Sequence, residues 1–273
     1  LFITHRLPYP SVKHAGGYYQ YSLIKELKSH NFSIDVLSFV NDEEYHHIFE
    51  LKKEVNRVFT IPIRKNSLEK IFHLPLLFIF PRFVVQAWRK EMANAIKKIL
   101  KNNQYDWVQC EYTQMAQYIR YIKNIPTSIM EHDISIIPVK RSYEKEKIFY
   151  KKLLKYITFI LTRFFEPRYL KKFNLILVYS EKDKKYISKL VKNKNIFVLS
   201  PPIIINNEKG YNININKNNI LFLGDLSRSP NIEAVLWFYN NVFITLKNEV
   251  QDVYFIIAGS NPSKEIINLN IDN

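Results

Sequence analysis

The sequence predicts an α/β fold, with a Rossmann-like parallel sheet followed by the beginning of a second Rossmann-like domain. Short apolar segments of strand length alternate with amphipathic segments of helix length along most of the chain. Several of the apolar segments are continuous, which is typical of strands that are buried on both faces of a sheet. The hydrophobic content of 47% is sufficient for a globular core.

Seven strands, separated by helices, are expected in the first and larger part of the chain. The expected strands are 1–4, 33–39, 57–61, 107–110, 127–130, 175–179 and 196–199. The shorter helices expected between them are 18–29, 42–54, 113–122 and 181–190. Two longer regions also have helical patterning: 67–101, which Pro75 and Pro81 interrupt, and the basic region 139–172, where Pro167 predicts a kink.

The α/β pattern stops at a segment rich in Pro and Asn and then begins again. Two further strands are expected, at 220–223 and 253–258, and Ser229-Pro230 has the residue types that begin a helix. Two strands are too few for an independent doubly wound domain, so we expect the second domain to be incomplete. The expected organisation is an N-terminal domain, 1–200, a linker, 201–217, and the start of a C-terminal domain, 218–273.

The chain is strongly basic, and the charge is concentrated in one region. Lys and Arg number 40 against 25 Asp and Glu, which gives a net charge of +15. The segment 140–194 contains 17 basic and 5 acidic residues. Such a block favours a polyanionic partner: nucleic acid, anionic lipid or a phosphorylated substrate. The alternative is a solvated helix face in a chain that is also rich in Asn and Ile.

The apolar segments and the single cysteine exclude several classes of protein. Cys110 alone can form neither an internal disulfide nor a multi-cysteine metal site. No secretory signal is present, and no apolar stretch approaches the roughly 20 residues that span a bilayer. The segment 74–90 is apolar, aromatic and flanked by bases; core packing is its commoner explanation, and a membrane interface is the alternative. We expect a cytoplasmic protein, with the inner face of the cell membrane as a further location.

Gly16 and Gly17 lie between the first strand and the first helix. The chain has only 5 glycines, so an adjacent pair is informative. Glycine permits positive φ angles and close approach of the backbone to a ligand, and a helix N-terminus favours an anion. An ordinary strand-to-helix turn explains the same residues.

Polar residues follow the expected strands, where ligands bind in open α/β sheets. His132 lies between Glu131 and Asp133, and an imidazole next to a carboxylate can exchange a proton near neutral pH. Glu111 and Tyr112 follow the preceding strand and are expected in the same crevice. A structural histidine and a helix N-terminal acid are the alternatives for His132 and Glu111.

The second domain offers a weaker group of candidates, Gly224, Asp225, Arg228 and Gly259, for which turns are the alternative explanation. His46 and His47 have no third ligand at metal spacing, so no metal site is expected. The chain also has no Walker-type phosphate loop, no Gly-x-Gly-x-x-Gly motif and no nucleophile-elbow serine. Kinase, dehydrogenase and α/β-hydrolase functions are therefore disfavoured.

Several motifs together resemble the family 4 glycosyltransferases, in the branch that makes bacterial surface polysaccharides. In the N-terminal domain these are Pro-Tyr-Pro followed by Gly-Gly, then Tyr-Asp-Trp-Val-Gln-Cys-Glu-Tyr and Pro-Thr-Ser-Ile-Met-Glu-His-Asp. In the C-terminal domain they are Ile-Leu-Phe-Leu-Gly-Asp-Leu-Ser-Arg-Ser-Pro-Asn and Val-Tyr-Phe-Ile-Ile-Ala-Gly-Ser-Asn-Pro. Each motif is weak alone, but the order and spacing of the set are fairly specific.

The resemblance implies a GT-B fold, in which two Rossmann-like domains bind a nucleotide sugar. It implies transfer of the sugar with retention at the anomeric carbon, to a lipid-linked or polysaccharide acceptor, without a cofactor or a catalytic metal. Gly16 and Gly17 match the glycine loop near the donor phosphates and the acceptor, and His132 matches the active-site histidine. Main-chain N–H groups and cations must stabilise the diphosphate that leaves.

Two departures put the donor side in doubt. Where many members have Arg and then Lys after the glycine that matches Gly224, this chain has Asp225 and Asn231, and Arg228 is only a candidate substitute. The Glu-x7-Glu element of the family would lie beyond Asn273, so we expect these residues alone to be inactive. A non-catalytic binding module of the same fold is the alternative function. Charge-driven binding of nucleic acid ranks last, because no recognition motif accompanies the charge.

Overall fold

The computed structural model describes residues 1–273 except 13–14, 64–74, 193, 202–217 and 270–273. It divides into two compact units, Leu1–Ile205 and Asn206–Asn273, and each unit is described by itself. The expected linker 201–217 lies outside the described residues except for its first residue.

The first unit is built on a sheet of seven parallel strands, as predicted. The strands are β1 (Phe2–Thr4), β2 (Asp35–Val40), β3 (Arg57–Pro62), β4 (Val108–Glu111), β5 (Thr127–Glu131), β6 (Leu175–Val178) and β7 (Asn195–Val198). Their order across the sheet is β3-β2-β1-β4-β5-β6-β7. The order therefore changes direction between β1 and β4, and in open α/β sheets this switch point is where ligands bind.

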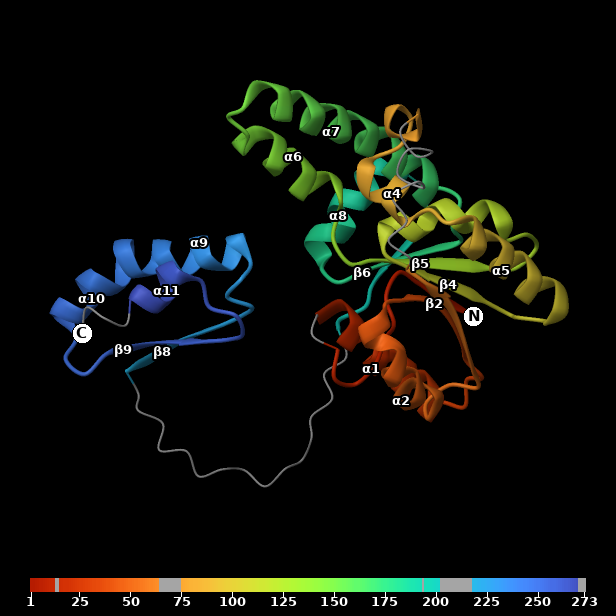
Figure 1. Cartoon of the computed structure of the whole chain (residues 1–273), viewed down its shortest axis with the longest axis horizontal. Helices are drawn as coiled ribbons and strands as arrows, with labels where there is room; N and C mark the ends of the chain where they lie inside the picture. The colour runs from red at the N-terminus through yellow and green to blue at the C-terminus, as the bar shows by residue number, and fades with distance from the viewer. Residues whose placement is uncertain (13–14, 64–74, 193, 202–217, 270–273) are drawn as a thin grey trace. The chain divides into compact units, whose positions relative to one another are not determined.

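Helices connect the strands of the first unit (Figure 1). The described ones are α1 (Ala15–Ser29), η1 (Asp42–His47), α2 (Ile48–Lys52), η2 (Pro75–Phe78), α4 (Arg82–Ala87), α5 (Lys90–Asn102), η3 (Thr113–Tyr121), α6 (Ile136–Lys145), α7 (Phe149–Leu170) and α8 (Glu181–Leu190). The expected helix 42–54 begins as the 3-10 helix η1 and continues as α2. The expected helix 113–122 is the 3-10 helix η3.

Two apolar cores cover the sheet. The smaller one packs α1 and α2 onto one face of β1 and β2, through residues such as Ile24, Leu51 and Val36. The larger one packs α5, η3, α7 and α8 against the sheet and includes Ile96, Met115 and Ile129. The segment 74–90, for which a membrane interface was the alternative, contributes to this packing, since Val84, Val85 and Ala87 of α4 are buried.

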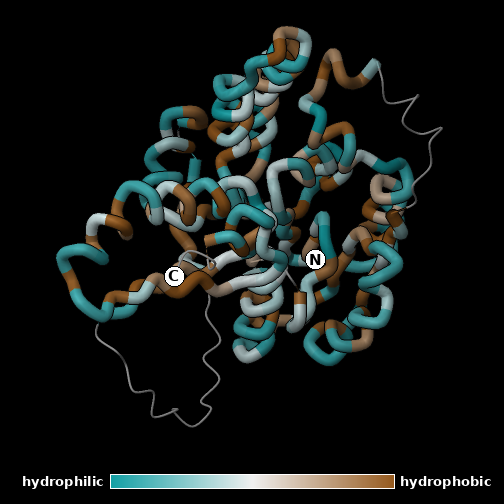
Figure 2. The backbone as a smooth tube through the Cα atoms, turned by 60° about the vertical axis from the view of Figure 1, so that its left-hand side comes forward, coloured by the Kyte–Doolittle hydropathy of each residue, from teal (hydrophilic) through white to brown (hydrophobic). Residues whose placement is uncertain are grey.

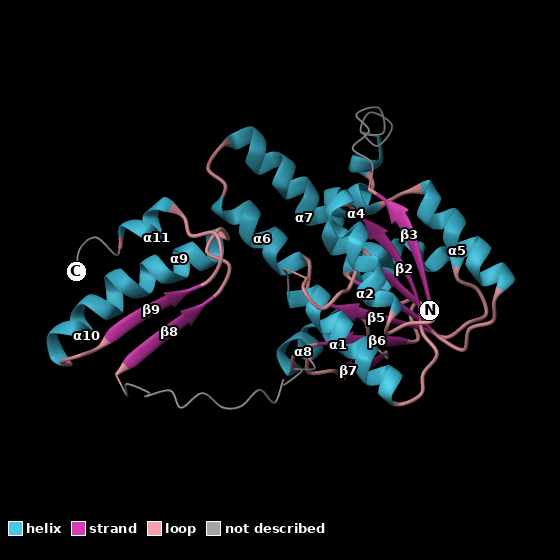
Figure 3. Ribbon diagram, turned by 60° about the horizontal axis from the view of Figure 1, so that its bottom comes forward, coloured by secondary structure: helices cyan, strands magenta, loops and turns pink. Residues whose placement is uncertain are grey.

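The long basic region is a helical hairpin rather than one kinked helix. The break lies at residues 146–148, where the Glu146 carboxylate accepts hydrogen bonds from the backbone N–H groups of Lys147 and Ile148, both at 3.1 Å. These bonds satisfy donors at the start of α7, and α7 then continues through Pro167 to Leu170. Tyr143 of α6 stacks on Phe159 of α7, and the hairpin projects from the sheet (Figures 1 and 3).

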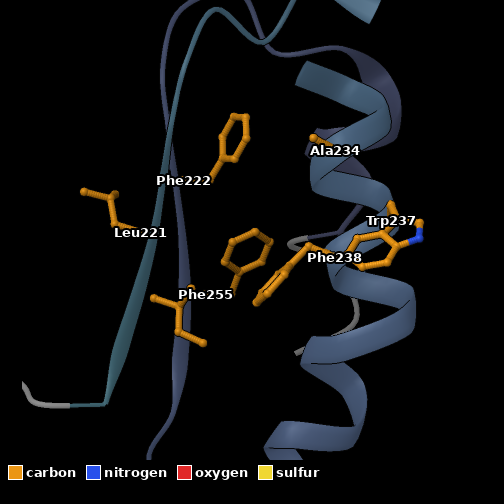
Figure 4. Close-up of a pocket in the computed structure, with 7 residues that line it drawn as sticks. Leu221, Phe222, Ala234, Trp237, Phe238 and Phe255 are labelled. Carbon is orange, nitrogen blue, oxygen red and sulfur yellow. The ribbon is translucent and has the colours of Figure 1, made fainter. Parts of the chain in front are cut away.

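The second unit contains a parallel pair of strands and a helical layer. Its described elements are β8 (Asn219–Leu223), α9 (Ser229–Phe238), the π-helix η4 (Tyr239–Phe243), α10 (Ile244–Glu249), β9 (Tyr254–Ala258) and α11 (Lys264–Asn268). Leu226, Val235 and Ile266 form its small core. A pocket of about 400 Å³ lies between the strands and α9. Phe222 and Phe255 point from the strands toward α9 (Figure 4), and the centroid of the Phe255 ring lies 4.8 Å from that of Phe238.

Among the described residues, no helix combines the length and the apolar composition that crossing a membrane requires.

Two buried carboxyl groups join α7 to the end of β5. Glu131 accepts a hydrogen bond from Thr113 at 2.5 Å, and Glu166 accepts one from the Ser135 backbone N–H at 2.7 Å. Each carboxyl also has a buried oxygen for which the described residues provide no hydrogen-bond partner. Burial raises the pKa of Glu166 to about 7. Burial, together with the nearby Glu166, raises the pKa of Glu131 well above its usual range. At least one of the two carboxyls therefore keeps its proton in mildly acidic solution.

Replacing Glu166 with Gln should stabilise the protein at alkaline pH. The folded state keeps a proton on Glu166 between about pH 4.5 and 7, whereas the unfolded chain loses it, so the stability of the native protein falls as pH rises through that range. Near pH 4.5 we expect E166Q and the native protein to have the same free energy of unfolding. Above pH 7 we expect that of E166Q to be higher by roughly 3 kcal/mol. Urea unfolding across this pH range measures the difference.

The control for this experiment is Glu144→Gln, which removes the exposed Lys140–Glu144 pair of 3.5 Å from α6. A surface pair of this kind contributes about 0–1 kcal/mol, so E144Q should follow the native curve at every pH. An E166Q protein whose stability declined with pH as steeply as that of the native protein would show that Glu166 stays ionised when folded.

Candidate functional site

Polar side chains that follow β1, β4, β5 and β6 meet at one edge of the central sheet. Three residues singled out in the sequence, Gly16, Glu111 and His132, come together there. Gly17 is buried in the first turn of α1, and Asp133 lies exposed beside the cluster. The strand-end prediction thus placed these residues at a common edge.

Glu111 fixes the orientation of His132. The Nε2 atom of His132 lies 2.8 Å from Oε2 of Glu111, and the two side chains are only 7% and 1% exposed. The other oxygen of Glu111 accepts a hydrogen bond of 3.0 Å from Gln109, which is also buried. A buried carboxylate in this place favours a histidine that carries its proton on Nε2. The Nδ1 atom is then free to accept a hydrogen bond.

Aromatic rings enclose the histidine. The hydroxyl of Tyr179, which follows β6, lies 3.3 Å from Nδ1 of His132 and is its donor in this tautomer. The ring of Tyr112 stacks on the imidazole, with 3.9 Å between centroids and 20° between planes. Gln20 of α1 lies 3.5 Å from Nε2 and accepts a hydrogen bond of 2.7 Å from Thr4. Four residues therefore surround the ring, from β4, from α1 and from the segments that follow β4 and β6.

The reason for a glycine at position 16 is space rather than an unusual backbone angle. Both glycines lie within α1, and the only described glycine with positive φ is Gly259. A Cβ atom on Gly16 would lie 2.5 Å from the hydroxyl oxygen of Tyr112 and 3.0 Å from Nδ1 of His132. The expectation of positive φ angles at Gly16 and Gly17 was therefore wrong. The expected close approach of the backbone to other groups is present at Gly16, where the groups belong to Tyr112 and His132.

Tyr112 has a backbone conformation that is rare for a residue with a side chain. Its φ is 74° and its ψ is 144°, at the junction between β4 and η3. Such conformations cost about 1–3 kcal/mol and cluster at functional sites. Burial raises the pKa of Tyr112, so its hydroxyl remains protonated. In this conformation the ring stacks on the imidazole and the hydroxyl lies beside Gly16.

The edge is also suited to an anion. The first turn of α1 contains no acidic residue, so no side chain of that turn competes for its N–H groups. Arg6, which follows β1, is exposed and is close enough to Tyr112 to lower the pKa of that hydroxyl, against the larger effect of burial. A helix N-terminus and a cation therefore lie near a histidine that can exchange a proton.

Three residues of this cluster were not predicted from the sequence: Arg6, Gln20 and Tyr179. Arg6 and Tyr179 could have been predicted from the rule that ligands bind beyond the carboxyl ends of strands, because each lies within two residues of the end of a strand. Gln20 had no sequence signal, since its contact with His132 spans 112 positions and depends on how α1 crosses the sheet.

The candidates in the second unit have local structural explanations. Gly224 and Gly259 follow the paired strands, and a Cβ on Gly259 would overlap the carbonyl oxygen of Gly224. The carboxylate of Asp225 accepts hydrogen bonds from the backbone and the hydroxyl of Ser227, at 3.0 and 2.7 Å, and these bonds lower its pKa. Arg228 is exposed. None of these four residues lines the pocket beside α9.

The pocket beside α9 does not resemble a nucleotide site. Its lining consists of Ile220, Leu221, Phe222, Ala234, Trp237, Phe238 and Phe255. Apart from the indole N–H of Trp237, these side chains have no polar group to orient a ligand. Among the described residues, no group of three or more His, Cys, Asp or Glu side chains lies close enough together to hold a metal ion.

The sequence matches no protein-family model and none of the curated proteins. Solved structures are similar, however. TarM covers 99% of this chain at 11% identity with a TM-score of 0.59, and the similarity spans 74% of TarM. UGT71G1 from Medicago truncatula, solved with UDP-glucose, covers 97% of this chain at 11% identity with a TM-score of 0.50. The similarity spans 67% of UGT71G1. Both are GT-B glycosyltransferases with Rossmann-like domains, so the chain has an α/β fold of that type.

A double-mutant cycle tests the contact between Gly16 and Tyr112. In the native background Gly16→Ala should destabilise the protein, because the overlap costs about 1–3 kcal/mol and the gain in helix propensity is about 1 kcal/mol. In a Tyr112→Phe background the hydroxyl is gone, so the same substitution should cost less by about 1 kcal/mol. Urea unfolding of the four proteins gives the coupling energy.

The control background is Tyr179→Phe, because Tyr179 contributes none of the atoms nearest to the added Cβ. There the cost of Gly16→Ala should equal that in the native background. Equal costs in all three backgrounds would mean that Tyr112 moves aside freely, and the close packing would not constrain position 16.

Proposed function

We propose that this protein is a glycosyltransferase that moves a sugar from a nucleotide-sugar donor to an acceptor hydroxyl. The observation that carries the proposal is the His132–Glu111 pair, packed against Gly16 at the switch point of a sheet of the GT-B type. A similar structure, UGT71G1 from Medicago truncatula, is complexed with UDP-glucose. The fold and the position of the cluster thus agree with the resemblance of the motifs.

The chemistry of transfer explains the residues at this edge. Breaking the bond between the sugar and the nucleotide leaves a diphosphate, so negative charge develops on the leaving group. The N–H groups at the start of α1 and the guanidinium of Arg6 supply positive potential at the same edge of the sheet. Because residue 16 has no side chain, the Tyr112 hydroxyl and the His132 imidazole lie against the start of α1, beside these N–H groups.

In the proposed reaction, His132 contacts the transferred sugar. Glu111 holds the Nε2 proton and leaves Nδ1 as an acceptor. For Nδ1 to accept a hydrogen bond from a sugar hydroxyl, Tyr179 must give up its contact of 3.3 Å. The imidazole therefore positions the sugar, and the Glu111 carboxylate offsets positive charge that develops on the imidazole or the sugar during transfer.

The finer features of the proposal rest on the resemblance of the motifs. They are membership of family 4, retention at the anomeric carbon, reaction without a metal, and a lipid-linked or polysaccharide acceptor at the cytoplasmic face of the membrane. In support, the candidate site contains protein groups that can stabilise the leaving diphosphate. The basic region 140–194 would face the anionic lipid.

A binding module without catalytic activity is the second candidate function. Asp225 favours it, because an ionised carboxylate lies at the position where the resemblance places a phosphate-binding arginine. A negative charge there opposes a diphosphate unless Arg228 compensates for it. Such a module would bind a nucleotide or a glycan through the first unit and transfer nothing.

The decisive assay uses the complete product of the gene that encodes this chain. The protein is incubated with a panel of radiolabelled nucleotide sugars, with and without a lipid extract and a polysaccharide fraction. Labelled product that depends on the acceptor supports the transferase. Saturable binding of a nucleotide sugar without transfer or hydrolysis supports the binding module. Neither binding nor turnover across the panel would refute both.

His132→Ala should reduce turnover more than donor binding. General acid–base and positioning groups contribute about 10²–10⁴-fold to rate, so we expect kcat to fall at least a hundredfold while KM for the donor changes little. The control is His30→Ala, at an exposed histidine that follows α1 and lies 3.3 Å from Glu26. H30A should retain full activity.

Circular dichroism of H132A establishes that the variant is folded before its rate is compared. A folded H132A protein with the native kcat would exclude His132 from the reaction. A raised KM with unchanged kcat would instead assign it to uniform donor binding.

A further inference from the structure

The tip of the α6–α7 hairpin exposes a cluster of large apolar side chains. These residues lie on the first turns of α7 and just before it, and their exposed fractions run from 42% to 82%. They are Ile148, Phe149, Tyr150, Leu153, Leu154 and Tyr156. Hydrophobic and hydrophilic residues are interleaved along this hairpin (Figure 2). Isolated exposed apolar residues are ordinary on protein surfaces, but a contiguous group of this size marks an interaction site.

Two residues of the cluster, Phe149 and Leu153, lie on the side of α7 that faces away from the protein. The inner side is defined by Phe165, Glu166 and other buried residues of the second half of the helix. At 3.6 residues per turn, Phe149, Leu153 and the 69% exposed Phe164 fall within an arc of roughly 60° that lies roughly opposite. An apolar stripe thus runs along the outer side of α7 and ends at the tip.

Basic residues surround the exposed cluster. Residues 140–155 include seven Lys or Arg and two Glu, an excess of five positive charges. Both glutamates are engaged in ion pairs within the hairpin, Glu144 with Lys140 and Glu146 with Lys155. Lys151 and Lys152 lie over the rings of Tyr150 and Tyr143. Charged groups therefore flank apolar ones, as in helices that lie in a membrane interface.

The composition of the surface selects among possible partners. Nucleic acid would use the lysines and the aromatic rings, but Ile148, Leu153 and Leu154 add little to the recognition of bases. A second copy of the chain would bring two basic tips together, and like charges oppose such a symmetric contact. Anionic lipid suits both the basic and the apolar residues of this surface, because headgroups pair with the lysines and acyl chains cover the apolar side chains.

We propose that the tip of the α6–α7 hairpin docks the protein on an anionic membrane surface. Phe149, Leu153 and Leu154 enter the boundary between headgroups and acyl chains, and Lys151 and Lys152 contact the lipid phosphates. No described helix is suited to cross the bilayer, so the hairpin lies at the surface. This inference names the contact surface for the membrane face included in the proposed function, but the contact itself requires neither donor nor acceptor.

Flotation with lipid vesicles tests the docking surface directly. The intact protein is mixed with vesicles of phosphatidylcholine and phosphatidylglycerol, or of phosphatidylcholine alone, in the absence of any nucleotide sugar. We expect binding to the anionic vesicles and little binding to the neutral ones. The double variant Phe149→Ser/Leu154→Ser should bind the anionic vesicles about a hundredfold more weakly. Lys151→Glu/Lys152→Glu should weaken binding by at least about thirtyfold.

Matched variants elsewhere in the same unit separate this surface from general hydrophobicity and charge. Phe32→Ser/Phe49→Ser removes two phenylalanines that are 60% and 68% exposed, and Lys52→Glu/Lys53→Glu makes the same change in net charge. Both controls should bind the vesicles as the native protein does. Quenching by brominated acyl chains gives a second measurement: the fluorescence added by Phe149→Trp should be quenched, and that added by Phe49→Trp should not.

Three outcomes would overturn the proposal. One is the absence of binding to anionic vesicles, and another is equal weakening by the hairpin variants and their matched controls. The third is a native protein that does not bind vesicles but forms a dimer in sedimentation velocity, where the Phe149→Ser/Leu154→Ser variant is monomeric. That result would assign the surface to a second copy. Failure of the sugar-transfer assay bears on none of these measurements.

Discussion

The hydrogen bond between Glu111 and His132 is the interaction on which the candidate site depends. It joins the ends of two neighbouring strands through a carboxylate that is 1% exposed, and such a carboxylate is costly to bury without a donor. Tyr112 stacks on this imidazole, and its backbone has a strained conformation. The Tyr112 hydroxyl and the imidazole leave no room for a side chain at Gly16. The buried pair, the stacked ring and the glycine are therefore packed against one another.

The end of β5 links this site to the α6–α7 hairpin. Successive residues of a strand point to opposite faces of the sheet, and Glu131 and His132 follow that rule at the end of β5. His132 joins the ligand edge, whereas Glu131 is buried with Thr113 near Glu166 of α7. The backbone N–H of Ser135, at the start of α6, also binds Glu166. A movement of the hairpin would therefore act on the residue next to the histidine.

The sequence predicted the fold and the common edge of the site for one physical reason. The carboxyl ends of parallel strands lie at the same edge, so the strand pattern alone brings Glu111, His132 and Gly16 to one place. Contacts that depend on how helices cross the sheet had no such signal, and Gln20 is the example. The burial of Glu166 could not be predicted either, because an acidic residue on a basic amphipathic helix is expected in solvent. The hairpin depends on Glu146, whose carboxylate accepts two backbone N–H groups and ends one helix before the next begins.

The inner side of α7 packs against the protein, whereas its outer side is exposed and apolar. Its inner side, near the C-terminal end, uses Phe165 and Leu170 for the core and Glu166 for a buried network, so it holds the hairpin to the sheet. Its outer side begins with Phe149, which is 82% exposed. A surface helix of a globular protein ordinarily has polar residues on that side. The fold itself does not use these exposed side chains, whereas the proposed contact with a membrane would bury them. The anchored end gives that contact a rigid support, which a flexible loop bearing the same residues would not provide.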